Sequence, residues 1–204
     1  FEDDLRDMPK PIRPYVEEAI EGYKSTKDPQ DIDITIDKGI FFYMNQIANG
    51  SDMEYLPIIV KMLIDITNIK SFIRIKLQDR NSQFFRKAFI EGGKLDFDLF
   101  GNNMGDSIEN FPPKIAHTDY YKWVKAGIEE FSKSGELGTV EKHGDDYLIE
   151  NLKKSKLVSF GPEPVIAYIL SVENEIRMIR IVLTGKKNDV PPDKIKERLR
   201  DLYV

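Results

Sequence analysis

Apolar side chains recur at helical spacing along most of this chain, and the clearest instance occurs twice. At about 100° per residue, one stripe falls within roughly 40° of a single line, and its members are Ile59, Leu63, Ile66, Ile73 and Leu77. A matching stripe follows later in the chain, formed by Val165, Ile169, Val172, Ile176, Ile179 and Leu183. Each segment carries a second apolar face, with Ile64, Phe72 and Ile75 in the first and Leu170, Met178 and Ile181 in the second. Helices that are apolar on two sides are expected to pack between neighbours.

The two segments are copies of one pattern. Residues 64–77 align without a gap on residues 170–183, at an offset of 174 − 68 = 106 between Asn68 and Asn174. The same offset relates Arg74 to Arg180. A period of this length is too long for a solenoid repeat. It predicts two similar helical subdomains in tandem, over 1–117 and 118–204.

The remaining patterns predict further helices and no sheet, because alternating hairpin signals are absent. Capping and breaking residues place helices over 15–24, 32–48, 55–79, 83–91, 119–132, 145–155, 161–185 and, as a terminal amphipathic helix, 192–202. Ser51 and Glu54 have the form of a capping box at the start of the third of these. Residues 94–118 mix loop signals with short helical pieces. The predicted fold class is all-α.

Asn68 and Asn174 lie in the middle of the second apolar face of their helices. A buried amide must find hydrogen-bond partners, since an unsatisfied one costs on the order of 1–3 kcal/mol. We therefore expect each asparagine to tie its helix to a neighbouring backbone or turn, with Arg74 and Arg180 bracing the junction through a carboxylate. A ligand site is the alternative, but finding the same pair twice in one short chain argues against it.

Composition narrows the function classes. A net charge of −5 and a pI of about 5.3 speak against a nucleic-acid-binding domain. The absence of cysteine excludes disulfides, iron–sulfur clusters and thiolate zinc sites. No apolar run approaches the 18 or so residues that a membrane-spanning helix needs. The chain begins at Phe1 rather than Met, so we interpret it as a fragment or processed form.

Candidate chemistry is sparse. His117 and His143 stand alone without metal-ligand spacing, and His143 is expected at a polar turn. The run from Asp31 to Asp37 resembles part of a calcium loop but has Ile36 where such a loop needs glycine. The sequence therefore predicts no catalytic, cofactor or metal site and no small-molecule substrate.

The C-terminal run 161–204 closely resembles the end of the C subunit of archaeal and bacterial V-type (A/V-type) ATPases, the counterpart of the eukaryotic d subunit. The resemblance is carried by Gly-Pro-Glu-Pro at 161–164, Glu173-Asn174, Arg177 with Arg180, Gly185-Lys186, and a final Leu202-Tyr203-Val204. It implies a helical funnel of three similar units related by pseudo-threefold symmetry. The present chain would hold the middle unit and the C-terminal unit, with the N-terminal unit missing.

The resemblance also implies a non-catalytic component of the central rotor. Such a protein would lie peripherally on the cytoplasmic face of the membrane and join the central stalk to the membrane rotor ring. It would transmit torque for ATP-coupled proton or sodium transport. Basic groups near the end are candidate partner contacts, namely Arg177, Lys186 and Lys187. The alternatives are a free-standing helical adaptor for a soluble protein partner and, third, a hydrolase with a metal held among Asp31–Asp37.

Overall fold

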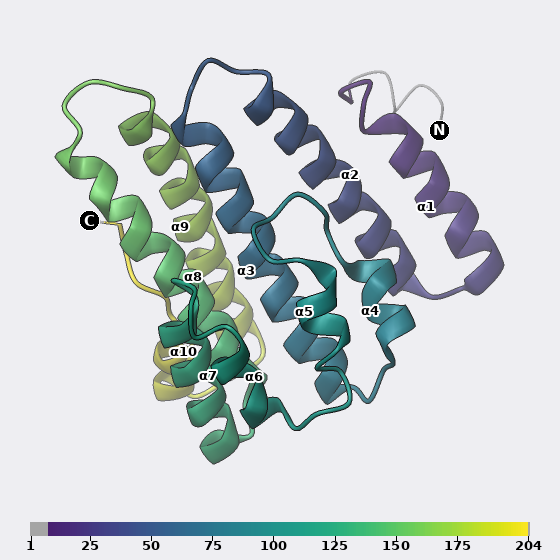
Figure 1. The fold of residues 1–204 in the computed structure, drawn as a ribbon. Coiled ribbons are helices and arrows are strands. Elements are labelled where there is room, and N and C mark those ends of the chain that lie inside the picture. The colour runs from purple at the N-terminus through teal and green to yellow at the C-terminus, as the bar shows by residue number, and fades with distance from the viewer. Residues whose placement is uncertain (1–7, 204) are drawn as a thin grey trace. The chain divides into compact units, whose positions relative to one another are not determined.

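The computed structural model describes residues 8–203, and within them the fold is helical throughout, without strands (Figure 1). The all-α prediction is confirmed. The chain divides into two compact units between Met104 and Gly105. This division precedes the repeat boundary expected at 117/118, and the two repeat units stay a prediction.

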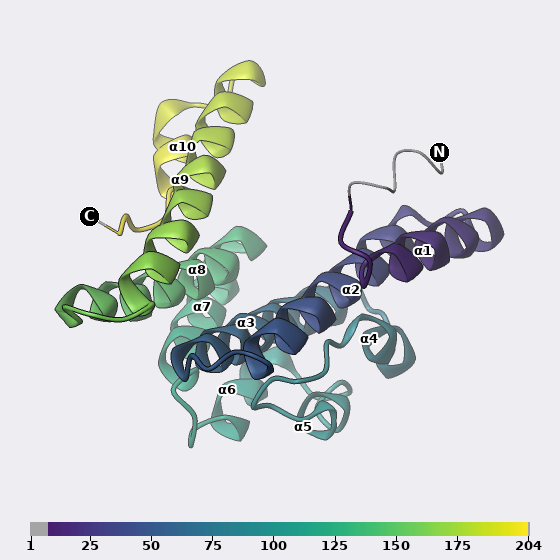
Figure 2. The same ribbon diagram turned by 90° about the horizontal axis from the view of Figure 1, so that it is seen from above.

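Unit 1 is built on three consecutive helices in which α2 packs against both α1 and α3 (Figures 1 and 2). Its elements are α1 (Arg13–Thr26), α2 (Pro29–Asn49), α3 (Tyr55–Leu77), α4 (Ser82–Ala88) and α5 (Phe97–Gly101). The start of α2 follows from its sequence, because the Asp28 side chain accepts a hydrogen bond from the Gln30 amide (3.0 Å) and Pro29 occupies the first turn.

Phenylalanines hold the short helices of unit 1 in place. Phe72 of α3, Phe85 of α4 and Phe100 of α5 are fully buried, and their ring centroids lie 5.4–5.6 Å apart. Helices of five to seven residues are not stable alone in water. The burial of these rings against α3 therefore keeps α4 and α5 folded.

The segment between α4 and α5 is anchored by two buried polar side chains of α3. Asn68 donates from Nδ2 to the Ile90 carbonyl (2.8 Å) and accepts at Oδ1 from the Ile90 amide (2.9 Å). Asp65 accepts from the amides of Lys94 and Leu95 at 3.0–3.1 Å. Both side chains are completely inaccessible to solvent. Side chains of α3 thus supply the hydrogen bonds that a non-helical backbone cannot make internally.

Glycine is required where this segment crosses α3. A Cβ on Gly93 would lie 2.2 Å from Oδ1 of Asp65, far inside any permitted contact. The close approach that lets Asp65 reach the amides beyond Gly93 therefore depends on the missing side chain.

Unit 2 contains three long helices, α7, α8 and α9, together with shorter ones. Its elements are η1 (Ile108–Asn110), α6 (Phe111–Lys114), α7 (Tyr121–Ser134), α8 (Leu137–Lys153), η2 (Lys154–Leu157), α9 (Glu163–Lys187) and α10 (Pro192–Glu197). As α2 does in unit 1, α8 packs against the helix before it and the long helix after it. The hydrophobic core includes Trp123 and Val124 of α7 together with Ile149 and Leu152 of α8, all buried.

Several predicted helix ends were wrong. The third helix has no capping box, because the Ser51 hydroxyl donates to the Ala48 carbonyl and α3 starts without a side-chain cap. The helix predicted over 145–155 begins at Leu137, eight residues earlier, and contains His143, which is therefore not at a turn. The terminal helix stops at Glu197 rather than reaching Leu202.

The first prediction concerns the anchor on α3. Asn68→Ala leaves the Ile90 amide and carbonyl buried without partners, so we expect the free energy of unfolding to fall by roughly 2–4 kcal/mol. A urea titration followed by circular dichroism measures the loss. The matched control is Asn49→Ala, which removes an exposed amide bonded to Asn45 and should cost less than about 0.5 kcal/mol. Equal effects of the two substitutions would contradict the anchoring role.

Candidate interaction surface on helix α9

The long helix α9 is the element around which the candidate surface is built. It begins after Pro162, carries Glu163 and Pro164 in its first turn, and ends with Lys186 and Lys187 in its last turn. Proline in the first turn and opposite charges at the two ends both suit a helix of this polarity. Its 25 residues give a rod about 37 Å long.

One side of α9 is fixed to the C-terminal segment. Asn174, nearly buried, donates from Nδ2 to the carbonyl of Asp201 (3.0 Å), while the Asp201 amide donates to Oδ1 of Asp146 on α8 (2.7 Å). Asp201, in the segment after α10, is thus hydrogen-bonded to both α8 and α9. Its role resembles that of Ile90 in unit 1, whose amide and carbonyl both bond Asn68.

A buried carboxylate on α8 joins the same elements. Asp145 accepts from Nη1 of Arg177 on α9 (2.8 Å) and from Nε of Arg200 in the C-terminal segment (3.0 Å). The Arg200 side chain is 8% exposed and that of Asp145 7%, whereas that of Arg177 is 54% exposed. The buried half of this triad is therefore the pair Asp145–Arg200.

The neighbouring carboxyl of Asp146 lies in a different electrostatic setting. Burial raises its pKa above the usual value, and the nearby charge of Asp201 acts in the same direction. The hydrogen bond from the Asp201 amide and the charges of Lys142 and Arg200 oppose this rise in pKa.

The other side of α9 does not match the prediction of two buried faces. Both faces of α3 are largely buried, yet the corresponding stripe on α9 is open to solvent. The exposed fractions are 61% for Val165, 54% for Ile169, 51% for Ile176, 58% for Ile179 and 62% for Leu183. We call this stripe the outer face of α9. Contiguous exposed apolar side chains of this kind mark sites of protein–protein contact.

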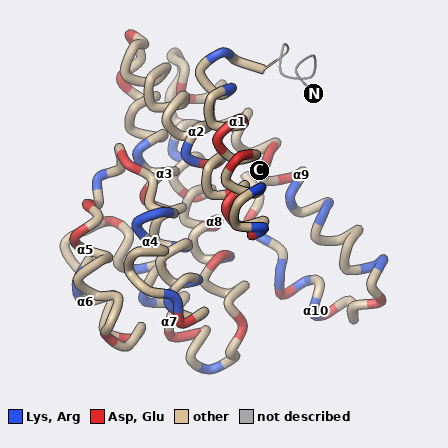
Figure 3. The backbone as a smooth tube through the Cα atoms, turned by 90° about the vertical axis from the view of Figure 1, so that its right-hand side faces the viewer, with Lys and Arg blue, Asp and Glu red and all other residues tan. Residues whose placement is uncertain are grey.

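The structure distinguishes among the basic residues that the sequence singled out. Arg74 of α3 lies near Asp37, whose pKa it lowers against the larger upward effect of burial. Arg180 has no carboxylate partner within residues 8–203, so the brace on α9 comes from Arg177 instead. Lys186 and Lys187 are exposed at the end of the helix. All Glu positions of α9 precede its Lys and Arg positions, which follow one another toward the end of the helix (Figure 3).

Sequence reasoning missed the decisive residues Asp145 and Arg200. Their pairing has no local sequence signal, because it joins residues 55 positions apart. The helix start predicted at residue 145 also placed Asp145 at a helix end rather than inside α8.

The side chains that could hold a metal ion are dispersed in the described part of the chain. Across residues 8–203, no group of three or more histidine, aspartate or glutamate side chains is placed to hold a metal ion. His143 contacts Glu130 (2.8 Å) between α8 and α7, a surface pair. None of the helices in this range is both long and apolar enough to cross a membrane.

Comparison with known proteins decides the family. The sequence pattern of the ATP synthase (C/AC39) subunit matches residues 2–198. The chain belongs to the ATP synthase (C/AC39) subunit family. This membership confirms the resemblance seen in the sequence.

Individual members of the C/AC39 family are similar along most of this chain. It is 27% identical over 199 residues to the C subunit of the V-type sodium ATPase of Enterococcus hirae, covering 97% of this chain and 60% of that protein. It is 24% identical over 195 residues to the C subunit of the A-type ATP synthase of Methanocaldococcus jannaschii, covering 92% of this chain and 48% of that protein. The chain thus spans about half the length of these curated relatives. No solved structure matches it.

The triad on α8 and α9 generates the second prediction. Arg200→Ala removes the buried cationic partner of the buried Asp145 and should lower the free energy of unfolding by roughly 3 kcal/mol. Arg177→Ala removes a half-exposed guanidinium and should cost less than about 1 kcal/mol. Urea titrations of the two variants measure the difference. Equal losses would show that burial does not set the strength of these ion pairs.

Proposed function

We propose that this chain is a non-catalytic part of a rotary ATPase that joins the central stalk to the membrane rotor ring and transmits torque between them. In this role it lies peripherally on the cytoplasmic face of the membrane and binds through protein contacts alone. Membership of the C/AC39 family, whose relatives belong to V-type and A-type ATPases, supports the assembly.

The observation that carries the proposal is the two-sided character of α9. Its inner side is fixed through the buried amide of Asn174 and through Arg177, which pairs with the buried carboxylate of Asp145 on α8. Its outer face presents a row of apolar side chains more than half exposed. A rod that is held on one side and open for apolar contact on the other is suited to carry force between two partners, because close-packed interiors transmit strain.

The proposal commits to one occupant of the outer face of α9, an apolar face of a helix from another protein of the rotary complex. The basic residues at the end of α9 add a charge preference, since Lys186 and Lys187 are exposed in its last turn. An acidic patch on the partner helix would complement them. The whole chain's other contacts, with stalk and ring, would involve further surfaces.

The third prediction tests this surface in the assembled complex. Ile176→Asp places a charge in the middle of the outer face, and co-purification of rotary ATPase subunits with the full-length protein from membranes should fall at least about tenfold. Changing Lys186 and Lys187 to Glu should also reduce the co-purification of these subunits. The matched control is Ile47→Asp on α2, since Ile47 is 48% exposed and Ile176 51%.

Two outcomes would contradict the proposal. Retention of the full complement of ATPase proteins by Ile176→Asp would exclude the outer face as a docking surface. A large loss of unfolding free energy in that variant, measured by urea titration, would assign the face to the protein's own core. Co-purification of the unaltered protein with a soluble partner and without ATPase subunits would favour the free-standing adaptor.

A further inference from the structure

A cleft occurs at the same place in both units. In each, it lies between the start of the second helix, the end of the long helix and the short helix that follows. Three pairs at the offset of 106 line the two clefts, namely Arg74 and Arg180, Ile75 and Ile181, and Gln78 and Thr184. The cavities differ in size, at about 160 Å³ in unit 1 and about 610 Å³ in unit 2.

An aromatic side chain accounts for the smaller cavity in unit 1. Phe84, the third residue of α4, lines the cleft and is half-buried, with the Arg80 guanidinium 4.9 Å from its ring centroid. α4 packs against both α2 and α3, so this ring lies where the three helices meet. The cleft of unit 1 therefore accommodates an aromatic ring.

Unit 2 has no such ring. The third residue of α10 is Lys194, whose ammonium group pairs with Glu197 (2.8 Å) and Glu136 (3.9 Å). The next residue, Ile195, is buried and packs on Gly185 of α9, as Phe85 is buried in unit 1. The cleft that remains has apolar side chains in its walls, contributed by Leu137, Ile181, Val190 and Ile195.

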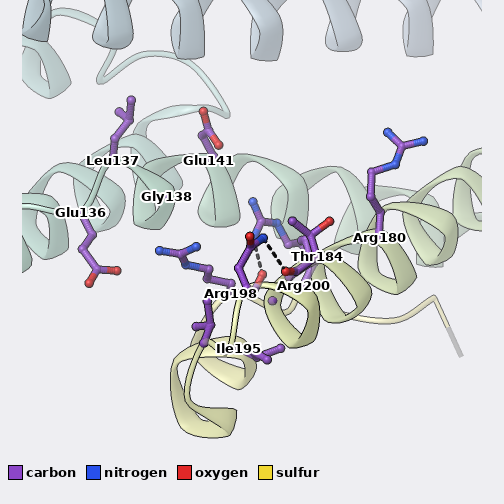
Figure 4. A pocket seen from close by; sticks show the side chains of 13 residues that line it. Glu136, Leu137, Gly138, Glu141, Arg180, Thr184, Ile195, Arg198 and Arg200 are labelled. Carbon is purple, nitrogen blue, oxygen red and sulfur yellow. Dashed lines mark hydrogen bonds between the residues drawn. The ribbon is translucent and has the colours of Figure 1, made fainter.

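Two cations line this apolar cleft without a carboxylate partner. Arg180 and Arg198 are exposed, and within residues 8–203 neither forms an ion pair. The other charged groups of the cleft are engaged, since Arg200 bonds Asp145, Glu136 pairs with Lys194, and Glu141 also has an interaction. Figure 4 shows the lining side chains coming from α8 on one side and from α9, α10 and the segment after α10 on the other.

We propose that the unit 2 cleft binds an acidic segment of a partner protein that carries an aromatic side chain. The ring occupies the position that Phe84 takes in unit 1, and flanking carboxylates pair with Arg180 and Arg198. A cavity of about 610 Å³ is within the range of clefts that enclose a bound group. Charge-assisted hydrogen bonds from guanidinium to carboxylate are the strong kind, which suits recognition of acidic residues.

This cleft is distinct from the outer face of α9, so the inference goes beyond the proposed function and can fail or succeed separately. Its test uses the whole chain in solution without other proteins of the complex, whereas the test of the outer face uses the membrane complex. The probe is a short fluorescein-labelled peptide with one Phe between glutamates, and binding is followed by fluorescence anisotropy. Control peptides replace the Phe by Ser or the glutamates by Gln.

We expect saturable binding of the acidic aromatic peptide and at least about tenfold weaker binding of both control peptides. Changing both cleft arginines, Arg180→Gln with Arg198→Gln, should weaken binding at least about tenfold. The matched control removes the same charge from two exposed lysines of α7 that lie outside the cleft, Lys122→Gln with Lys133→Gln, and should change the affinity less than about twofold.

A second pair of variants tests the aromatic position by placing in unit 2 the phenylalanine that unit 1 has there. Lys194→Phe supplies the missing ring and should lower affinity at least about tenfold by occupying the cleft. Lys194→Ala removes the same charge, leaves the cleft open and should retain binding, since an exposed ion pair contributes little to the fold. Unchanged urea midpoints verify that all variants are folded.

Three results would overturn the inference. One is the absence of saturable binding up to about 1 mM peptide. Another is equal weakening by the arginine and lysine pairs, which would indicate general charge attraction. The last is unaltered affinity in Lys194→Phe despite normal stability.

Discussion

The fold depends on how the non-helical segment between α4 and α5 forms backbone hydrogen bonds with side chains of the buried helix α3. Between α4 and α5 the chain runs over α3 in a conformation that makes no internal hydrogen-bond ladder. Asn68 replaces that ladder with one donor and one acceptor for Ile90, and Asp65 adds acceptors for Lys94 and Leu95. A buried backbone group left unpaired would cost on the order of 1–3 kcal/mol. Asn68 and Asp65 therefore allow this segment to cover α3.

Unit 2 meets the same constraint with different chemistry. Asn174 bonds the Asp201 carbonyl, and the corresponding amide goes to Asp146 on α8. The position equivalent to Asp65 is Ser171, whose hydroxyl bonds its own helix at Tyr168. An ion pair between Asp145 and Arg200 takes over as the buried polar link. Unit 2 thus uses an ion pair where unit 1 uses amide and carboxylate contacts with the backbone. Its helix α10 is also shorter than α4 of unit 1 and has no aromatic side chain, and the cleft beside it is larger.

Sequence patterns predicted the parts of the fold where one signal dominates. The apolar periodicity around Asn68 placed α3 to within two residues of its end, and Asn49-Gly50 placed the end of α2. The start of α8 was missed because Gly138, Thr139 and Gly144 have low helix propensity, which contact with α7 overrides. Periodicity also showed that α9 is apolar on two sides but could not show which side is covered, since that depends on neighbours and not on the helix itself. The pairing of Asp145 with Arg200 joins residues 55 positions apart and has no local signature.

Hydrogen–deuterium exchange of the Ile90 amide in the native protein tests the central claim most directly. This amide lies outside every helix, so its protection depends on its bond to Asn68. If the buried asparagine is the anchor, the Ile90 amide exchanges with the free energy of global unfolding, as slowly as amides in the middle of α3. Exchange at the rate of an open loop, with α3 still protected, would contradict the account.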